Sequence, residues 1–458
     1  MNQTDNTDNV LELASEAGHI LLQNGAEISR VEDTMARIAA HYGVETGNFF
    51  VLSNGIFTTS SPGRYAKVEF IPIRAIQLSK VVAVNKLSFD IAAGKYTLEQ
   101  AREELERIKA GSPKPAWEQI AGSAFGAAGF CAVFGGSFID CAADFVIGAL
   151  LYIFCLYFSE RYMSKIVGGI CNALIATLLS IVAFRLGAGE SLSNIIIGAV
   201  MPLIPGVPYV NGVRDLVNSD YIAGLTRLTD AMLGFFCIAI GVSIAFMLDG
   251  WAAGGIIELH QMSIHPSTSG LGWQFLAAFI GTFAFAILFG SPRKQYFAAG
   301  IIGALGWAAY LLMVRALGSS AFVAILIATA LVCILSRFAA VSHKCPSTVF
   351  VLCGIFPLVP GAGVFWFTYY LISSQFHLSA MTGFTAMKAA LAIALGIVFA
   401  MELPQRLFSG HRKRRYSSAS RSVTSQSCKN IIVKLSTAFP LSMTAVSFQC
   451  PKRTRWLI

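Results

Sequence analysis

The chain has 458 residues, of which 55% are hydrophobic and 13% are charged. A soluble domain carries about a quarter charged residues, so the composition excludes an ordinary soluble protein and indicates a polytopic membrane protein. Residues 409–458 hold ten Lys and Arg and no Asp or Glu, and the remaining 24 basic residues are balanced by 25 acidic ones. The net charge of +9 therefore predicts no nucleic-acid partner. It predicts a basic tail that can meet anionic lipid.

The ten cysteines show neither a CxxC pair nor the spacing of zinc ligands. We interpret them as small buried apolar residues and predict no disulfide framework, no metal and no cofactor. The polar, acidic start "MNQTDNTDNV" lacks a basic region followed by an apolar core, so no cleaved signal peptide is expected.

Residues 1–115 are predicted to form a small cytosolic α+β domain with the order ααββαα. Apolar residues recur at helical spacing in "NVLELASEAGHILLQNGAE" and "ISRVEDTMARIAAHYG", and strands are expected in "NFFVLSNGIFTTSS" and "RYAKVEFIPI" with a turn at 61–63. Two further helices follow, the second of which begins with a capping box at Thr97 and Gln100. The segment "GSPKPAW" is the expected linker out of this domain.

Ten apolar segments follow, each near the ~20 residues that a membrane-spanning helix needs. Lys and Arg are concentrated in alternate short loops, which places the N-terminal domain and the basic tail in the cytosol. We therefore expect a mainly α-helical, multi-pass protein of the plasma (inner) membrane with both termini cytoplasmic. The expected spans are 117–136, 139–158, 165–184, 192–210, 228–248, 271–290, 296–314, 319–336, 347–372 and 383–402.

A shift of 155 residues brings the two halves of the apolar region into one register. "PLIPG" from Pro202 then matches "PLVPG" from Pro357, and "VIGAL" matches "IIGAL". Five spans in each half is an odd number, so the two halves, residues 116–250 and 271–405, are predicted to be inverted repeats. Secondary transporters are often built in this way, with the binding site at the repeat interface. The tail, residues 409–458, is expected to be disordered.

The two Pro-Gly breaks allow two interpretations. Each could be a simple kink of the kind common in membrane helices. Alternatively, broken helices at matching positions form a substrate site, where the half-helix N-termini bind a carboxylate and freed carbonyl groups around Leu203 and Leu358 bind an ammonium group. The candidate substrate-binding residues are Pro202, Pro205, Gly206, Pro357, Pro360 and Gly361.

Several charged residues are candidates for a gate or for proton transfer. Arg214, Asp215, Asp220, Arg227 and Asp230 follow the first break, and they form either a solvated loop with weak ion pairs or a gate. Asp140 and Asp144 share one helix face. For Asp140 a helix-start role at the outer surface is favoured, whereas Asp144 is the better proton carrier because it lies deeper.

Glu27, Arg30, Glu32 and Asp33 cluster at one helix start in the N-terminal domain. They form either a charged face whose acids favour the helix N-terminus or a surface that docks on the cytosolic loops.

Several stretches of the sequence carry a resemblance to a known family. "LLQNGAEISRVEDTMARIAAHYGV" and "MPLIPGVPYVNGVRDLVNSDYIAGLTRLTDAML", with "GIFTT" and "VNKLS", resemble the threonine/serine exporter family over about residues 10–405.

The resemblance implies export of threonine, serine or similar small carboxylates, driven by the proton gradient, by a protein that is not an enzyme. The implied partners are the substrate, protons and the lipid bilayer, and a homo-oligomer is left open. Beyond "RLFSGHRKRR" the sequence no longer resembles the family.

Two alternatives to a transporter remain. One is a membrane-anchored enzyme or sensor acting through residues 1–115, and the other is a passive channel. The positions that match the family's functional residues are Gly25, Glu27, Arg30, Glu32, Pro202, Pro205, Gly206, Arg214, Asp215, Asp220, Gly224 and Arg227.

Overall fold

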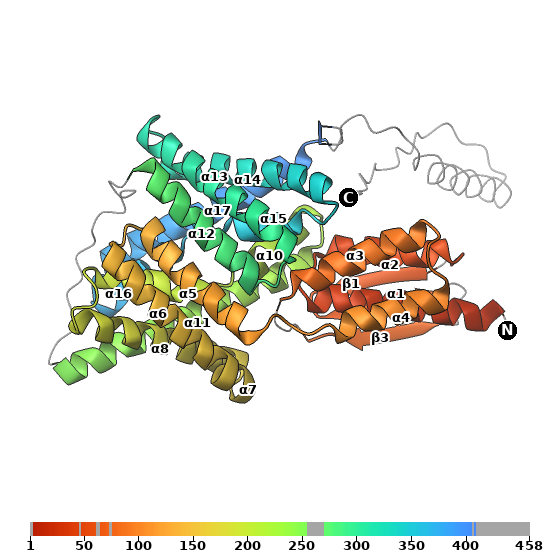
Figure 1. Cartoon of the computed structure of the whole chain (residues 1–458), viewed down its shortest axis with the longest axis horizontal. Helices are drawn as coiled ribbons and strands as arrows, with labels where there is room; N and C mark the ends of the chain where they lie inside the picture. Colours follow the sequence, from red (N-terminus) through yellow and green to blue (C-terminus); the bar gives the residue numbers. More distant parts are fainter. Residues whose placement is uncertain are drawn as a thin grey trace, which may run out of the picture. The chain divides into compact units, whose positions relative to one another are not determined.

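The computed structural model describes residues 3–44, 47–60, 65–72, 76–253, 270–404 and 407–408. Most of these residues are helical (Figure 1). The chain divides into two compact units, Met1–Glu402 and Leu403–Ile458, and the helices and strands of the described residues lie in the first. The expectations for residues 61–63 and for the tail 409–458 fall outside the described residues.

The N-terminal α+β region contains four helices and one antiparallel sheet of strand order β1-β2-β3. Its order is ααβββαα, so the prediction of two strands is wrong. The segment "NFFVLSNGIFTTSS" reverses at Ser53-Asn54-Gly55, residues that favour turns, and Leu52 pairs with Gly55 across this turn. The elements are α1 Gln3–Gln23, α2 Ile28–His41, β1 Gly47–Leu52, β2 Gly55–Ser60, β3 Ala66–Phe70, α3 Leu78–Ala92 and α4 Leu98–Ala110.

This region has its own apolar core, which follows from the amphipathic pattern of its helices. The apolar face of α2 is buried with α1 against Val51 and Ile56 of the sheet. The predicted capping box of α4 is confirmed, because Thr97 and Gln100 exchange both of its hydrogen bonds. The start of α2, with its charged residues, is therefore held on a folded core.

The helical region forms helices in all ten predicted segments. The second segment continues from α6 through a π-helical turn, Cys155–Ser159, into α7. The bounds are α5 Ala116–Val133, α6 Phe138–Phe154, α7 Glu160–Tyr162, α8 Lys165–Arg185, α9 Leu192–Val200, α10 Gly206–Val217, α11 Tyr221–Ala253, α12 Leu271–Leu288, α13 Tyr296–Arg315, α14 Ala321–His343, α15 Thr348–Gly354, α16 Gly361–Ile372 and α17 Phe376–Glu402.

Seven of the described helices are long and apolar enough to cross a membrane, which identifies a polytopic membrane protein. Two bent pairs bring the number to nine: α9 with α10, bent by 58°, and α15 with α16, bent by 42°. Helix α5 is the tenth predicted span. Its first turn carries Glu118 and Gln119, and three glycines follow, so its sequence is less apolar than that of the others. The count of ten remains a prediction.

Helices α5 and α12 pack together at the centre of the helical region because small residues line their contact (Figure 1). A Cβ atom added at Gly129 would lie 2.8 Å from the backbone nitrogen of Gly281. Phe130 and Phe285 then pack edge to face beside this contact, with ring centroids 5.0 Å apart. The close approach joins the first half of the helical region to the second.

We expect Gly129→Ala to destabilise the protein by about 1–3 kcal/mol, because the new methyl group meets backbone atoms that cannot rotate away. Thermal unfolding of the purified protein in detergent measures the effect. Gly272→Ala on α12 is the matched control, since a Cβ atom there meets nothing within 4 Å. Equal unfolding temperatures for the two variants would contradict the close contact.

Candidate functional site

The two helix breaks have the same backbone geometry. Each starts with one turn of 3-10 helix, Met201–Leu203 (η2) and Phe356–Leu358 (η4). The next residue leaves the helix, with ψ of 127° at Ile204 and 132° at Val359. Proline disfavours the helical conformation in the residue before it and lacks an N–H group itself. The six predicted residues occupy these turns and half-helix starts: Pro202, Pro205, Gly206, Pro357, Pro360 and Gly361.

The breaks lie against each other in a reciprocal way. A Cβ atom at Gly206 would lie 2.5 Å from the ring of Phe356, and one at Gly361 would lie 2.4 Å from Ile204 and 2.9 Å from Met201. Met201 and Phe356 are themselves equivalent under the shift of 155 residues. Each glycine therefore makes room for a side chain of the other break.

The half-helices that start at the breaks offer unequal numbers of backbone donors. The first N–H groups of a helix have no partner within the helix. In α10 one of them is missing because Pro208 has no N–H, whereas the equivalent residue in α16 is Gly363. The N-terminus of α16 is consequently the better equipped of the two to bind an anion.

A narrow pocket lies beside the breaks. Its wall is apolar except for the hydroxyl of Thr368, which donates to the carbonyl oxygen of Val364 at 2.9 Å. Thr368 could also accept a hydrogen bond from a ligand through its free lone pairs. The lining residues come from α9, α11, α16 and both breaks: Val200, Ile204, Phe235, Ile238, Val242, Gly361, Val364, Phe365 and Thr368.

Asp144 and Asp140 have different surroundings although both are buried in α6. Asp140 accepts hydrogen bonds from three backbone N–H groups, those of Ser137, Glu190 and Ser191. It is thus a structural cap that fixes the loop before α9. Asp144 lies against Gly198 of α9. Apart from the weak thiol donor of Cys131, neither of its oxygens has a hydrogen-bond partner among the described residues.

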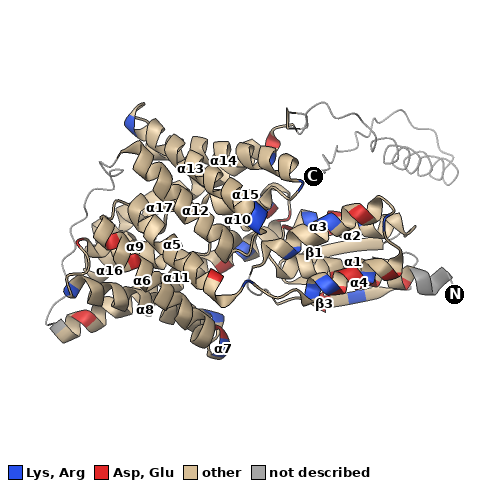
Figure 2. Cartoon of the chain, viewed as in Figure 1, with Lys and Arg blue, Asp and Glu red and all other residues tan. Residues whose placement is uncertain are grey.

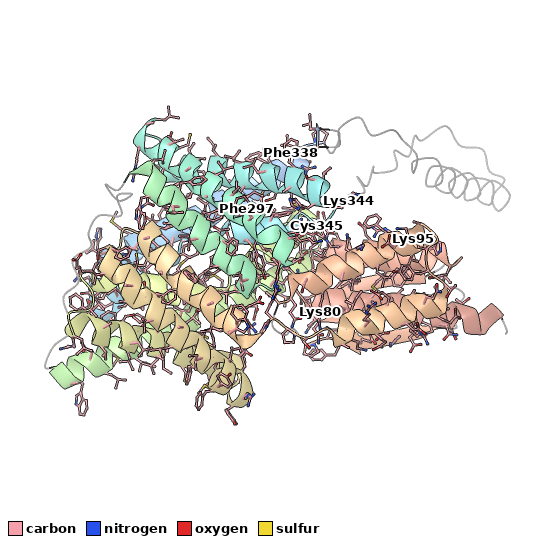
Figure 3. All side chains as sticks on the ribbon, viewed as in Figure 1. Lys80, Lys95, Phe297, Phe338, Lys344 and Cys345 are labelled. Atoms are coloured by element: carbon pink, nitrogen blue, oxygen red, sulfur yellow. The ribbon has the colours of Figure 1, made fainter. Side chains whose placement is uncertain are left out.

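Charged residues also meet where α2 contacts the helical region. Figure 2 shows few charges along α5, α12 and α13, and a group of them beside α10. We call this contact the α2–α10 junction, defined by residues 25–30 on one side and by residues 211–227 with Thr348 on the other. Figure 3 labels Lys344 and Cys345, which follow α14 on the side that faces this junction.

At the junction, Glu27 is held between two arginines. Its Oε1 accepts a hydrogen bond of 2.6 Å from Arg30, and its Oε2 lies 2.6 Å from Nη2 of Arg214. Arg214 also donates to the hydroxyl of Thr348 on α15, at 2.7 Å. Burial by itself would raise the pKa of Glu27, but the charges of Arg214 and Arg30 hold that pKa below its ordinary value of 4.5.

A second ion pair lies beside the first. Asp215 is fully buried, accepts from Arg227 at 2.8 Å, and accepts the N–H of Ile28 at 3.1 Å. Because α2 has no side-chain cap of its own, Asp215 caps α2 from another helix. Arg227 also donates to the carbonyl oxygen of Ala26, and Asn211 to that of Gly25, each at 2.8 Å.

The junction brings together residues that the sequence placed in separate groups: Gly25, Glu27 and Arg30 with Arg214, Asp215 and Arg227. Glu32 lies apart and accepts from the backbone of Val51. The carbonyl oxygen of Asp220 accepts from Gly224 at the start of α11. The sequence analysis missed Asn211 and Thr348, although an amide in the apolar half-helix "GVPYVNGV" is a signal for Asn211.

Comparisons with known proteins identify relatives of the chain. Residues 12–249 match a family model described as "Putative threonine/serine exporter", and residues 274–402 match one described as "Threonine/Serine exporter, ThrE". The "Probable threonine/serine exporter" of Mycobacterium tuberculosis is 25% identical over 374 residues, which cover 78% of this chain and 69% of that protein. No solved structure matches the chain.

The names of two further relatives give different transported substrates. The "Threonine/serine exporter" of Corynebacterium glutamicum is 22% identical over 418 residues, which cover 87% of this chain and 83% of that protein. The "Probable succinate transporter subunit YjjP" of Klebsiella aerogenes is 26% identical over 251 residues, which cover 53% of this chain and 96% of that protein. All three names describe transport proteins.

We expect Glu27→Gln to lower the unfolding temperature at pH 7, because the buried Arg214 loses its counter-charge, at a cost of about 3–5 kcal/mol. A carboxyl whose pKa is lowered stabilises the fold above its ordinary pKa, and this contribution is lost as the pH falls through the lowered pKa. The difference between wild type and variant should therefore be full above pH 4.5 and shrink in more acidic buffer. Glu106→Gln, at an exposed pair, is the control, and a difference that does not vary with pH would refute the assignment.

Proposed function

The chain belongs to the threonine/serine exporter family, and from this premise we propose that it exports threonine, serine or similar small carboxylates from the cytoplasm, coupled to the proton gradient. The observation that carries the proposal is the pair of broken helices, which pack reciprocally beside a pocket. Broken helices at matching positions of two halves are typical of secondary transporters. The names of the relatives fit the same class of cargo.

The two halves, residues 116–250 and 271–405, are proposed to be inverted repeats. The start of α5 and the end of α12 lie on the side of the N-terminal region. Leu78 and Ser79 donate to the carbonyl oxygens of Phe289 and Gly290 at 3.0 and 2.8 Å, and Arg293 pairs with Glu118. The equivalent helices α5 and α12 thus point in opposite directions, which supports the inverted arrangement.

The N-terminal domain, residues 1–115, is proposed to lie in the cytoplasm, as is the tail. The loops after α12 and α14 lie on the side of the helical region that carries this domain. They contain Arg293, Lys294 and Lys344, which agrees with the positive-inside rule. The protein would then be a multi-pass protein of the plasma (inner) membrane with both termini inside.

The substrate site is proposed at the crossing of the breaks. The first turn of α16 would bind the substrate carboxylate through the N–H groups that follow Gly361, because Gly361 itself donates to the carbonyl oxygen of Val359 at 2.7 Å. The hydroxyl of Thr368 would accept a hydrogen bond from the ammonium or hydroxyl group of the substrate. Pro202, Pro205, Pro357 and Pro360 keep the backbone open here, and Gly206 allows the helices to cross. A carboxylate is common to threonine, serine and succinate, so the contact with α16 fits all three, whereas the contact with Thr368 fits threonine and serine alone among them.

Asp144 is proposed to carry the coupled proton. A buried carboxyl without a cationic partner is more stable when it is protonated, and it can lose that proton when the helices around it open to water. Arg214, Asp215, Asp220 and Arg227 are proposed to form the cytoplasmic gate.

Replacing Thr368 by Val should raise the KM for efflux several-fold at a normal protein level, because the pocket loses its polar group while the side chain keeps its shape. Efflux from preloaded proteoliposomes measures the effect. Thr385→Val is the matched control, because Thr385 makes the same hydrogen bond to the residue four positions earlier but is exposed. An unchanged KM would contradict the placement of the substrate.

Replacing Asp144 by Asn should abolish proton movement with the substrate. A pH-sensitive dye inside proteoliposomes reports whether a substrate gradient drives protons. Asp140→Asn is the comparison: it should lower the unfolding temperature, because three backbone donors lose a charged acceptor, yet leave coupling intact. Proton movement that persists in Asp144→Asn would rule out this residue as the carrier.

A further inference from the structure

Glu27 places a carboxylate between arginines from two parts of the chain. One of its oxygens faces Arg30 on α2 and the other faces Arg214 on α10. Two arginines around one carboxylate are a common way of recognising such a group. The side chains are buried, with 5% of Glu27, 10% of Arg30 and 7% of Arg214 exposed. The proposed cargo carries the same chemical group.

The fit of Glu27 between the arginines is incomplete. Its Oε2 forms an ion pair with Arg214 at 2.6 Å, but this contact lacks the alignment of a hydrogen bond. Nε of Arg30 has no hydrogen-bond partner among the described residues. A buried donor or acceptor without a hydrogen-bond partner destabilises the folded state. A free carboxylate, which is not tied to α2, could satisfy these groups better.

The contacts that hold the N-terminal region to α10 and α11 are centred on Glu27. Asn211 binds Gly25, Arg227 binds Ala26, and Asp215 binds Ile28. Arg214 extends the network to Thr348 in the second half. Displacing Glu27 would therefore loosen the point at which the N-terminal region joins both halves.

We propose that Arg30 and Arg214 form a second carboxylate site, filled in this structure by Glu27, and that a free cytoplasmic carboxylate of the transported class displaces Glu27 and releases α2 from α10. The choice of ligand class rests on the proposed function. The N-terminal region then opens the cytoplasmic end when cargo is present. The site differs from the pocket at the breaks, because none of its residues lines that pocket.

The test uses a cysteine pair across the junction in the full chain. Ser29 and Asn218 are in contact, with 3.1 Å between Nδ2 of Asn218 and Oγ of Ser29, so Ser29→Cys with Asn218→Cys should form a disulfide under mild oxidation. The rate is measured on purified protein in nanodiscs with threonine, succinate or threoninol, which lacks the carboxylate. We expect threonine or succinate to slow the reaction several-fold and threoninol to leave it unchanged. Equal rates in all conditions would overturn the proposal.

Two variants separate this site from the pocket at the breaks. In a Gly361→Leu background, or in Thr368→Val where the former does not fold, the slowing by carboxylate should persist. Its loss would mean that the ligand acts only through the breaks, and would overturn the second site. With Glu27→Gln the disulfide should form slowly even without ligand, and a rate equal to that of the parent would also overturn it. None of these readouts requires transport, so they are independent of the proposed export activity.

Locking the junction tests its role in opening. The oxidised Ser29→Cys, Asn218→Cys protein should lose efflux and regain it after reduction. The control pair is Phe50→Cys with Phe57→Cys, two exposed residues that lie directly opposite each other on β1 and β2 within the N-terminal region, at the spacing of a cross-strand pair that a disulfide can bridge. The parent protein under the same oxidant controls for its own cysteines. Full efflux from the locked protein would refute the release of α2.

Discussion

The structure depends on one constraint, the loss of backbone hydrogen bonds where proline interrupts a helix inside an apolar body. Proline cannot donate an N–H group, and lipid offers no partner for the carbonyl groups that are freed. Both breaks must therefore be enclosed by protein. They enclose each other, since Gly206 receives Phe356 and Gly361 receives Ile204. The small residues at the contact of α5 and α12 bring the two halves close enough for this.

Helix α10 connects the first break to the α2–α10 junction. It begins at the break with Gly206 and carries Arg214 and Asp215 in its last turn, so about 12 Å of helix separates the break from these two charged residues of the α2–α10 junction. The cap that Asp215 provides to α2 couples the N-terminal region to the same element.

The sequence predicts local features well and distant pairings poorly. The ten helical segments and both breaks were predictable, because apolar runs and Pro-Gly pairs act within a few residues. The third strand was missed because Ser53-Asn54-Gly55 was placed inside one strand. The pairing of Glu27 with Arg214 joins residues far apart in the chain, and the contact of Arg214 with Thr348 joins two halves. Only packing decides which of several arginines meets a given carboxylate, so Glu27 and Arg214 were predicted as candidates but their pairing was not, and Thr348 was not predicted.

The reciprocal contact of the breaks has a consequence for assembly. Each half supplies one broken helix and the side chain that fills the space left by the glycine of the other. A half on its own would expose an empty notch and an unpaired apolar side chain at the same place. The two halves are therefore complementary parts of one interface. A change in the size of Phe356 in one half would require a matching change around Gly206 in the other, whether the halves are joined in one chain or not.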